Sequence, residues 1–268
     1  PSPSNIQWTV WPRAREDQKH VAWGGETVTG TVQSLYNWIL EEHNGPPCAK
    51  NSGAHWNPST TVDGHRANES VLGVSGLTLD CDGAGDWDVV LSHLDSTNVS
   101  YVAYRTGGHS PKAPKWRLYI PFTEPFKVNG DKNRARLWHI LYESLQTKME
   151  SVSGFLPGQR YDQNTKAVSN AFYLGQRRTA TSPIGEVRIG SGKLSIDGPA
   201  EMKSLVKGIK AARKNSKART ATSCGSYKTT SEILPRETVI ALTEGGHPTG
   251  TTLLEDAVEG SHCICPKH

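Results

Sequence analysis

The sequence has no long run of apolar residues. Hydrophobic residues make up 35% of the 268 positions, and no stretch approaches the roughly 20 consecutive apolar residues that a transmembrane helix needs. No charged segment followed by an apolar stretch marks a secretory signal either. We therefore expect neither an integral membrane protein nor a secreted one. The apolar fraction is nevertheless sufficient for a packed core.

Cysteine is scarce, and neither sign of charge is in large excess. Five cysteines in a chain of this length argue against a disulfide framework, which predicts a reducing, cytoplasmic compartment. Lys and Arg total 30 against 26 Asp and Glu, for a net charge of +4. This charge permits a nucleic-acid partner without requiring one. The first residue is Pro1, so we expect the natural start to lie upstream or to have been removed.

The middle of the chain contains a regular alternation of strand and helix patterns. In order, these patterns predict a strand at 74–82, a helix at 86–94, strands at 99–105 and 115–122, a helix at 131–150 capped by Asp131, and a strand at 170–175. Pro121 is expected to end its strand, because proline cannot donate to a sheet. The βαββαβ order is typical of the ferredoxin-like, or RRM-like, fold, an antiparallel sheet with both helices on one face.

The predicted class is therefore α+β. An N-terminal α/β elaboration precedes the core, with a helix at 31–43 and mostly loop at 44–70. We expect residues 1–195 to form one main domain, with the RRM-like core at about 72–178. Residues 196–268 are expected to form a small, basic, helical appendage and tail, which could lead into a further module.

Two carboxylates, Asp80 and Asp82, end the first strand of the predicted core. Side chains two residues apart on a strand point to the same face, so these carboxylates converge. Like charges that close repel each other unless a cation lies between them, and Mg²⁺ or Mn²⁺ suits such hard oxygen ligands. The alternative interpretation is a solvated pair of carboxylates in a loop.

A glycine-rich basic segment, 107–117, connects two adjacent strands of the predicted sheet. It carries His109 and Ser110, and it ends in Lys115 and Arg117, which share one face of the following strand. Glycine lets a backbone approach a ligand closely, and cations directed at one place suit a triphosphate. The alternative interpretation is a basic surface hairpin without a ligand.

Asp162 precedes the last predicted strand and could supply a third carboxylate at the edge that carries Asp80 and Asp82; otherwise it is a cap or turn residue. Three carboxylates that hold two cations would stabilise the attacking 3′-hydroxyl and the leaving pyrophosphate of nucleotidyl transfer. His109 and the basic side chains would then bind the phosphates of the incoming nucleotide.

Together these segments resemble the catalytic core of the archaeo-eukaryotic primase superfamily, and most of all the primase-polymerases of phages, plasmids and other mobile elements. The stretches that carry the resemblance are LTLDCDG (77–83), GGHSPKAPKWRLYIPF (107–122), YDQN (161–164) and NAFYLG (170–175). The resemblance implies an RRM-like core and metal ligation by Asp80, Asp82 and Asp162, with nucleotide contact by His109. It also implies a bacterial or phage-infected cell and a fused or separate replicative helicase as partner.

Two further details concern this resemblance. The segment DGHRANESV (63–71) resembles a basic stretch that precedes the acidic strand in the family, which implies a nucleotide or template contact for Arg66. The family's His motif usually has a serine two residues before the His, and here Gly107 stands there. This departure concerns one nucleotide contact and not the metal site.

The C-terminal part of the chain offers two weaker signals. Seven basic residues lie between 203 and 219, on either a solvated helix face or a helix that contacts single-stranded DNA, with Lys207, Lys210, Arg213 and Lys214 as the candidate contacts. The last residues resemble the opening of a zinc-ribbon segment, in which Cys265 and His268 would bind Zn²⁺. The alternative is a tail with an incidental cysteine.

The sequence favours a DNA primase-polymerase that joins nucleoside triphosphates on a single-stranded DNA template with two Mg²⁺ or Mn²⁺ ions. A replication initiator that binds DNA without catalysis and a metal-dependent nuclease are the alternatives. The intact acidic pair argues against the initiator, whereas Gly107 favours it. Cations beside His109 suit a triphosphate better than a scissile diester.

Overall fold

The computed structural model describes residues 5–11, 24–48, 53–83, 85–155, 159–174, 179 and 185–223. The chain divides into two compact units, Pro1–Glu201 and Met202–His268. The second unit is described only as far as the end of helix α4 (Gly198–Ser223), so Cys265 and His268 lie outside the described residues. Within the described part, no helix is both long and apolar enough to cross a membrane.

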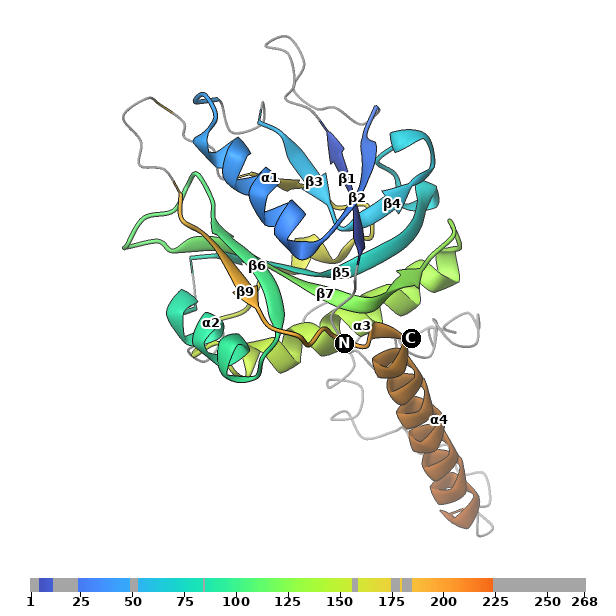
Figure 1. The fold of residues 1–268 in the computed structure, drawn as a ribbon. Helices are drawn as coiled ribbons and strands as arrows, with labels where there is room; N and C mark the ends of the chain where they lie inside the picture. Colours follow the sequence, from blue (N-terminus) through green and yellow to red (C-terminus); the bar gives the residue numbers. More distant parts are fainter. Residues whose placement is uncertain are drawn as a thin grey trace, which may run out of the picture. The chain divides into compact units, whose positions relative to one another are not determined.

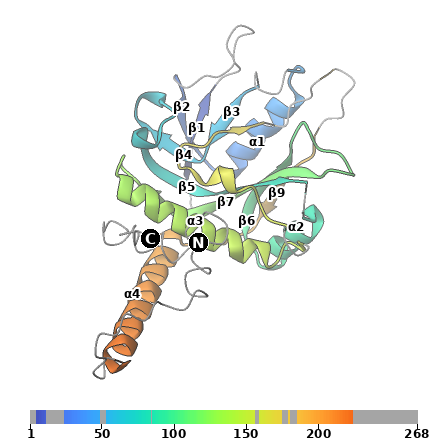
Figure 2. The ribbon, with the colours of Figure 1, turned by 180° about the vertical axis from the view of Figure 1, so that it is seen from behind.

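Two antiparallel sheets form the first unit (Figures 1 and 2). The four-stranded sheet has the order β2-β1-β3-β8, formed by Glu26–Gly30, Ile6–Trp11, His55–Asn57 and Phe172–Tyr173. The five-stranded sheet has the order β4-β5-β7-β6-β9, formed by Ser59–Thr61, Val71–Asp82, Lys115–Lys127, Ser100–Arg105 and Val187–Ser191. The mixture of helices and antiparallel strands confirms the predicted α+β class.

Three helices of the first unit confirm the helices expected from sequence periodicity: α1 (Val32–Asn44), α2 (Trp87–Ser96) and α3 (Lys132–Glu150). Each begins after a residue whose side chain accepts hydrogen bonds from the first N–H groups, and these caps are Thr31, Asp86 and Asp131. The buried residues of each helix recur at helical spacing, as an amphipathic face requires.

The five-stranded sheet is covered on both faces. Alternate residues of β7 point to opposite faces. On one face, Trp116 packs edge-on against Trp87 of α2 and Phe122 packs against Trp138 of α3. On the other face, Tyr119 belongs to the core that the sheet shares with α1 and the four-stranded sheet. Burial on both faces explains why β5 is buried almost end to end.

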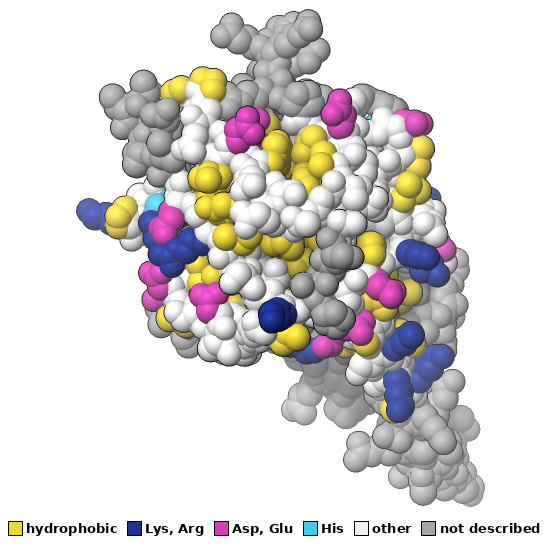
Figure 3. Space-filling model, viewed as in Figure 1, with side chains coloured by type: hydrophobic (Ala, Val, Ile, Leu, Met, Phe, Trp, Pro, Cys, Tyr) yellow, Lys and Arg dark blue, Asp and Glu magenta, His cyan; other side chains and the backbone are white. Residues whose placement is uncertain are grey.

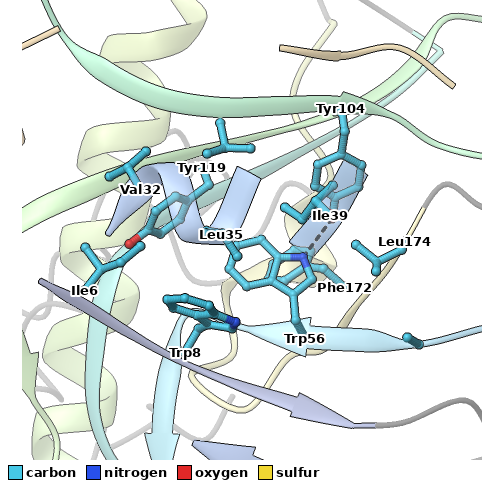
Figure 4. Packing of buried hydrophobic residues seen from close by; sticks show 12 residues of the cluster. Ile6, Trp8, Val32, Leu35, Ile39, Trp56, Tyr104, Tyr119, Phe172 and Leu174 are labelled. Atoms are coloured by element: carbon cyan, nitrogen blue, oxygen red, sulfur yellow. Dashed lines mark hydrogen bonds between the residues drawn. The ribbon is translucent and has the colours of Figure 1, made fainter. Parts of the chain in front are cut away.

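The main core lies between the two sheets and α1 (Figure 4). Leu35 and Ile39 of α1 are fully buried there. Trp56 of β3 packs against them, and its indole N–H donates a 3.0 Å hydrogen bond to the hydroxyl of Tyr104 on β6. This bond satisfies a buried indole and fastens the two sheets together.

The last strand predicted for the RRM-like unit lies in the other sheet. Only Phe172–Tyr173 forms a strand there, as β8, and it pairs with β3 instead of β5. The place beside β5 is taken by β4, and β9 extends the opposite edge next to β6. Only the short segment 62–70, with its two turns Val62–Gly64 and Asn68–Ser70, separates β4 from β5. The short connection favours pairing of these two strands.

One smaller expectation is wrong, and another holds with an addition. The strand that Pro121 was expected to end continues to Lys127. Pro121 pairs with Gly76 next to a register shift in β5, and such an irregularity accommodates the missing N–H. The segment 44–70, expected to be mostly loop, contains the short strands β3 and β4.

Candidate functional site

Asp80 and Asp82 lie directly opposite two cationic residues. The register of β5 and β7 pairs Asp80 with Arg117 and Asp82 with Lys115. Directly paired residues share a face of the sheet. The four charged side chains therefore lie on one face, as two neighbouring pairs that each join β5 to β7. Arg117 is on the same face of β7 as Tyr119, which is the face turned toward the four-stranded sheet.

The inner pair, Asp80 and Arg117, is largely shielded from solvent. Arg117 Nε and Nη2 donate to the same oxygen, Asp80 Oδ2, at 3.0 and 2.8 Å, and both side chains are only 14% exposed. Arg117 Nη1 donates to the main-chain carbonyl of Tyr173, and the guanidinium lies over the ring of Phe172. Tyr104 of β6 lies directly opposite Arg117 in the sheet and completes its surroundings.

The electrostatics of Arg117 follow from this enclosure. Burial alone would lower its pKa, but the neighbouring charge of Asp80 and the hydrogen bonds outweigh burial and raise the pKa above its ordinary value. Arg117 therefore keeps its charge, and Asp80 has a permanent cationic partner.

The outer pair, Asp82 and Lys115, is more open. Its side chains form an ion pair and are 56% and 36% exposed. An ion pair in contact with water contributes about 0–1 kcal/mol to stability. Lys115 can therefore exchange Asp82 for another anion at little cost, whereas Arg117 cannot leave Asp80 as easily.

His109 lies in the hairpin that joins β6 to β7. The main-chain N–H of Lys115 donates a 3.2 Å hydrogen bond to His109 Nδ1, so the neutral ring carries its proton on Nε2. Burial, followed by the charge of Arg105, lowers the pKa of His109. Ser110 Oγ accepts a 3.1 Å hydrogen bond from the N–H of Ala113 and closes the hairpin.

Asp162 lies beside Asp80, as the sequence predicts. Its main-chain N–H donates a 2.8 Å hydrogen bond to the main-chain carbonyl of Asp80. Its carboxylate accepts a 2.8 Å hydrogen bond from the N–H of Asn164 and caps the short helix η3 (Gln163–Lys166). Asp162 is thus a cap as well as a neighbour of Asp80.

The oxygens of the three carboxylates are the type of ligand that a hard cation prefers. Asp80 and Asp82 share one face of β5, and each forms an ion pair with a cation of β7. In the described part of the chain, however, no three acidic, His or Cys side chains converge on one point. The carboxylates are turned instead to Arg117, Lys115 and the N–H of Asn164.

The remaining candidates belong to other elements. Arg66 lies between the turns η1 (Val62–Gly64) and η2 (Asn68–Ser70), and among described residues no hydrogen bond or ion pair joins it to the three carboxylates. Lys207 and Lys210 are exposed on α4, which also contains the other two candidate DNA contacts, Arg213 and Lys214.

Sequence patterns did not reveal the side chains that surround the site. Tyr104 and Phe172 are neighbours of Arg117, and Arg105 forms a 3.3 Å ion pair with Glu186 near His109. Figure 3 shows basic and acidic side chains gathered beside a His at the left edge of this face, where Figure 1 places the β6–β7 hairpin. The alternation of strand residues could have placed Tyr104 on the same face of the sheet as Arg117. It could not have shown that the two residues lie directly opposite each other.

No protein-family model matches this chain, and no curated protein is significantly similar to it. Two solved structures are similar. The primase-polymerase AEP domain of cyanophage S-2L is 18% identical, with a TM-score of 0.38 over 75% of this chain and 88% of that one. Primase RepB′ is 14% identical, with a TM-score of 0.37 over 83% of this chain and 64% of that one. The first of these neighbours is described as a primase-polymerase and the second as a primase.

Proposed function

We propose that this chain is a DNA primase-polymerase, which transfers nucleotides from nucleoside triphosphates on a single-stranded DNA template. The observation that carries the proposal is the pairing of Asp80 with Arg117 and of Asp82 with Lys115 across two strands, with Asp162 hydrogen-bonded to Asp80. Carboxylates beside an exchangeable lysine suit a reaction that brings cations and a polyphosphate to one place.

Each side chain has a distinct part in this proposal. Asp80, Asp82 and Asp162 hold Mg²⁺ or Mn²⁺, which neutralises charge on the attacking and leaving oxygens when bound. Lys115 leaves Asp82 and binds a phosphate of the incoming nucleotide. His109 donates from Nε2 to a second phosphate oxygen, because its Nδ1 is occupied by the N–H of Lys115.

The proposed setting is replication of a phage or mobile element, with single-stranded DNA as template and a helicase as a further partner. Lys207 and Lys210 are exposed on α4 and are proposed to contact template phosphates, together with Arg213 and Lys214 of the same helix. Phosphate contacts of this kind position a template without selecting its sequence.

The test is incorporation of labelled nucleotides on single-stranded DNA, with Mg²⁺ or Mn²⁺, and with and without a primer. The double variant Asp80→Ala/Asp82→Ala is compared with the wild type. Glu124→Gln is the matched control, because Glu124 is an exposed carboxylate toward the other end of β7. We expect product from the wild type and the control, and none from the double variant.

The same assay separates the alternatives. A nuclease shortens the template in the absence of any triphosphate. An initiator binds the template but incorporates no nucleotide in any lane. Either result, obtained with folded protein, contradicts the polymerase proposal.

A further inference from the structure

Arg117 and Lys115 are two residues apart on β7, yet their surroundings differ. Lys115 is 36% exposed and has one anionic partner, Asp82. Arg117 is 14% exposed, and its donors are directed at Asp80 and Tyr173. The sequence pattern alone assigns both residues to the triphosphate, but only Lys115 can turn to a new anion without leaving buried groups unpaired.

We infer that Arg117 is a positioning residue for Asp80 and not a ligand of the triphosphate, an inference that rests on the proposed function. Both hydrogen bonds to Asp80 end on Oδ2. Arg117 therefore holds Oδ2 in place and leaves Oδ1 to a cation. Asp80 then acts as a ligand through one oxygen only.

The anchors of Arg117 make this role specific. Nη1 donates to the carbonyl of Tyr173 in β8, and Tyr104 of β6 lies directly opposite Arg117 in the five-stranded sheet. These contacts come from both sheets. They fix the guanidinium independently of Asp80, so the orientation of the carboxylate is set by groups that do not touch the substrate.

A competing role is that Arg117 is a temporary partner of Asp80 that leaves when a metal ion arrives. The two roles predict opposite changes in metal affinity. If Arg117 positions Asp80, its loss disorders a ligand and weakens metal binding. If Arg117 merely occupies the place of the metal, its loss frees Asp80 and strengthens binding.

The test is Arg117→Lys, which keeps the positive charge but removes the planar fork that holds Oδ2 and Tyr173 together. Lys115→Gln is the matched comparison on the same strand. Mn²⁺ affinity is measured by the electron paramagnetic resonance signal of free Mn²⁺, without nucleotide or DNA. KM and kcat for the nucleotide are measured on a primed template, and Tm is measured for each protein.

We expect Arg117→Lys to weaken Mn²⁺ binding and to lower kcat, each by about tenfold, while the nucleotide KM changes by less than about twofold. We expect Lys115→Gln to raise the nucleotide KM about tenfold without weakening Mn²⁺ binding, because it removes a cation that competes for Asp82. A higher nucleotide KM with unchanged Mn²⁺ affinity in Arg117→Lys would overturn the inference. Tighter Mn²⁺ binding would overturn it as well.

A second variant covers the case in which Arg117→Lys does not fold. Tyr104→Phe removes the hydroxyl beside Arg117 and leaves the guanidinium in place. It also removes the acceptor of the Trp56 indole N–H, so Trp56→Phe, which loses that hydrogen bond but keeps the Tyr104 hydroxyl, is its control. We expect Mn²⁺ affinity to fall about threefold with an unchanged nucleotide KM; an unchanged affinity contradicts the inference. The proposed function fails separately, if wild-type protein binds Mn²⁺ no better than Asp80→Asn.

Discussion

The main-chain N–H of Asp162 donates a 2.8 Å hydrogen bond to the main-chain carbonyl of Asp80. Two residues that are far apart in the sequence are thus fixed side by side by their backbones, whatever their side chains do. The bond that joins the two residues involves neither carboxylate. This arrangement allows the charge of Asp162 to be removed without disturbing its place.

Asp162→Asn is therefore a clean test of the third carboxylate. Asparagine also accepts a hydrogen bond from the N–H of Asn164, so the cap of η3 is retained. We expect nucleotide incorporation to fall roughly 100-fold, while Tm changes by less than about 2 °C. Asp162→Ala is the comparison, and it should cost about 1 kcal/mol of stability as well. Wild-type activity in Asp162→Asn would exclude a metal role for this residue.

The tautomer of His109 predicts which replacement retains function. A glutamine side chain can place an N–H donor near the position of Nε2, whereas alanine has none. We expect His109→Ala to raise the nucleotide KM about tenfold and His109→Gln to recover part of that loss. Steady-state kinetics on a primed template measure both. Equal KM values in wild type and His109→Ala would remove His109 from the nucleotide site.

His43 gives the stability of the fold a pH dependence. Its Nδ1 and Nε2 lie 3.0 and 3.1 Å from the carbonyl oxygens of Ile39 and Arg105. Burial lowers the pKa of His43 below its ordinary value of 6.5, although both backbone bonds oppose this shift. The unfolded chain therefore binds a proton near pH 6.5 that the folded protein does not bind. Stability contributed by His43 is present above pH 6.5 and is lost as the pH falls toward the lowered pKa.

Urea unfolding between pH 7.5 and 5 measures this effect. The free energy of unfolding should decrease by at most about 1.4 kcal/mol per pH unit for each proton taken up. His43→Asn should show a smaller decrease than the wild type, because the other histidines with lowered pKa values, His109 and His139, are present in both proteins. Identical pH slopes would show that His43 does not titrate differently on folding.

The basic helix α4 is tested by the salt dependence of DNA binding. If Lys207 and Lys210 contact template phosphates, Lys207→Gln/Lys210→Gln should reduce the slope of log affinity against log salt by roughly 1.4 for single-stranded DNA. Lys127→Gln/Lys132→Gln removes the same charge from exposed lysines of β7 and α3 and serves as the control. An equal change in both variants would mean that net charge alone is responsible.

Local sequence patterns predicted the parts of the fold that local interactions determine. Helices α1, α2 and α3 were predicted because their apolar periodicity is a local property of the sequence. For α3 the cap Asp131 was also predicted, since a cap depends only on its neighbours in the sequence. The partner of β8 was not predicted, because nothing in Phe172–Tyr173 specifies whether β3 or β5 lies beside it. Strand pairing is decided by packing between distant segments, which a single sequence does not display.

The same distinction applies to the site. The spacing of Asp80 and Asp82, and that of Lys115 and Arg117, correctly places each pair on one strand face. Their register across the two strands was not predicted, and this register is what separates an enclosed ion pair from an open one. The difference between Arg117 and Lys115 therefore became visible only with the exposure of each pair.

The segment from Asp162 to Tyr173 crosses from one sheet to the other. It is tied to β5 at Asp162, to the side chain of Asn57 at the carbonyl of Val168, and to β3 at Phe172–Tyr173. The segment therefore links the five-stranded sheet to the four-stranded sheet at defined points. A shift of one sheet against the other would have to break at least one of these attachments. The position of Asp162 beside Asp80 therefore depends on how the two sheets pack.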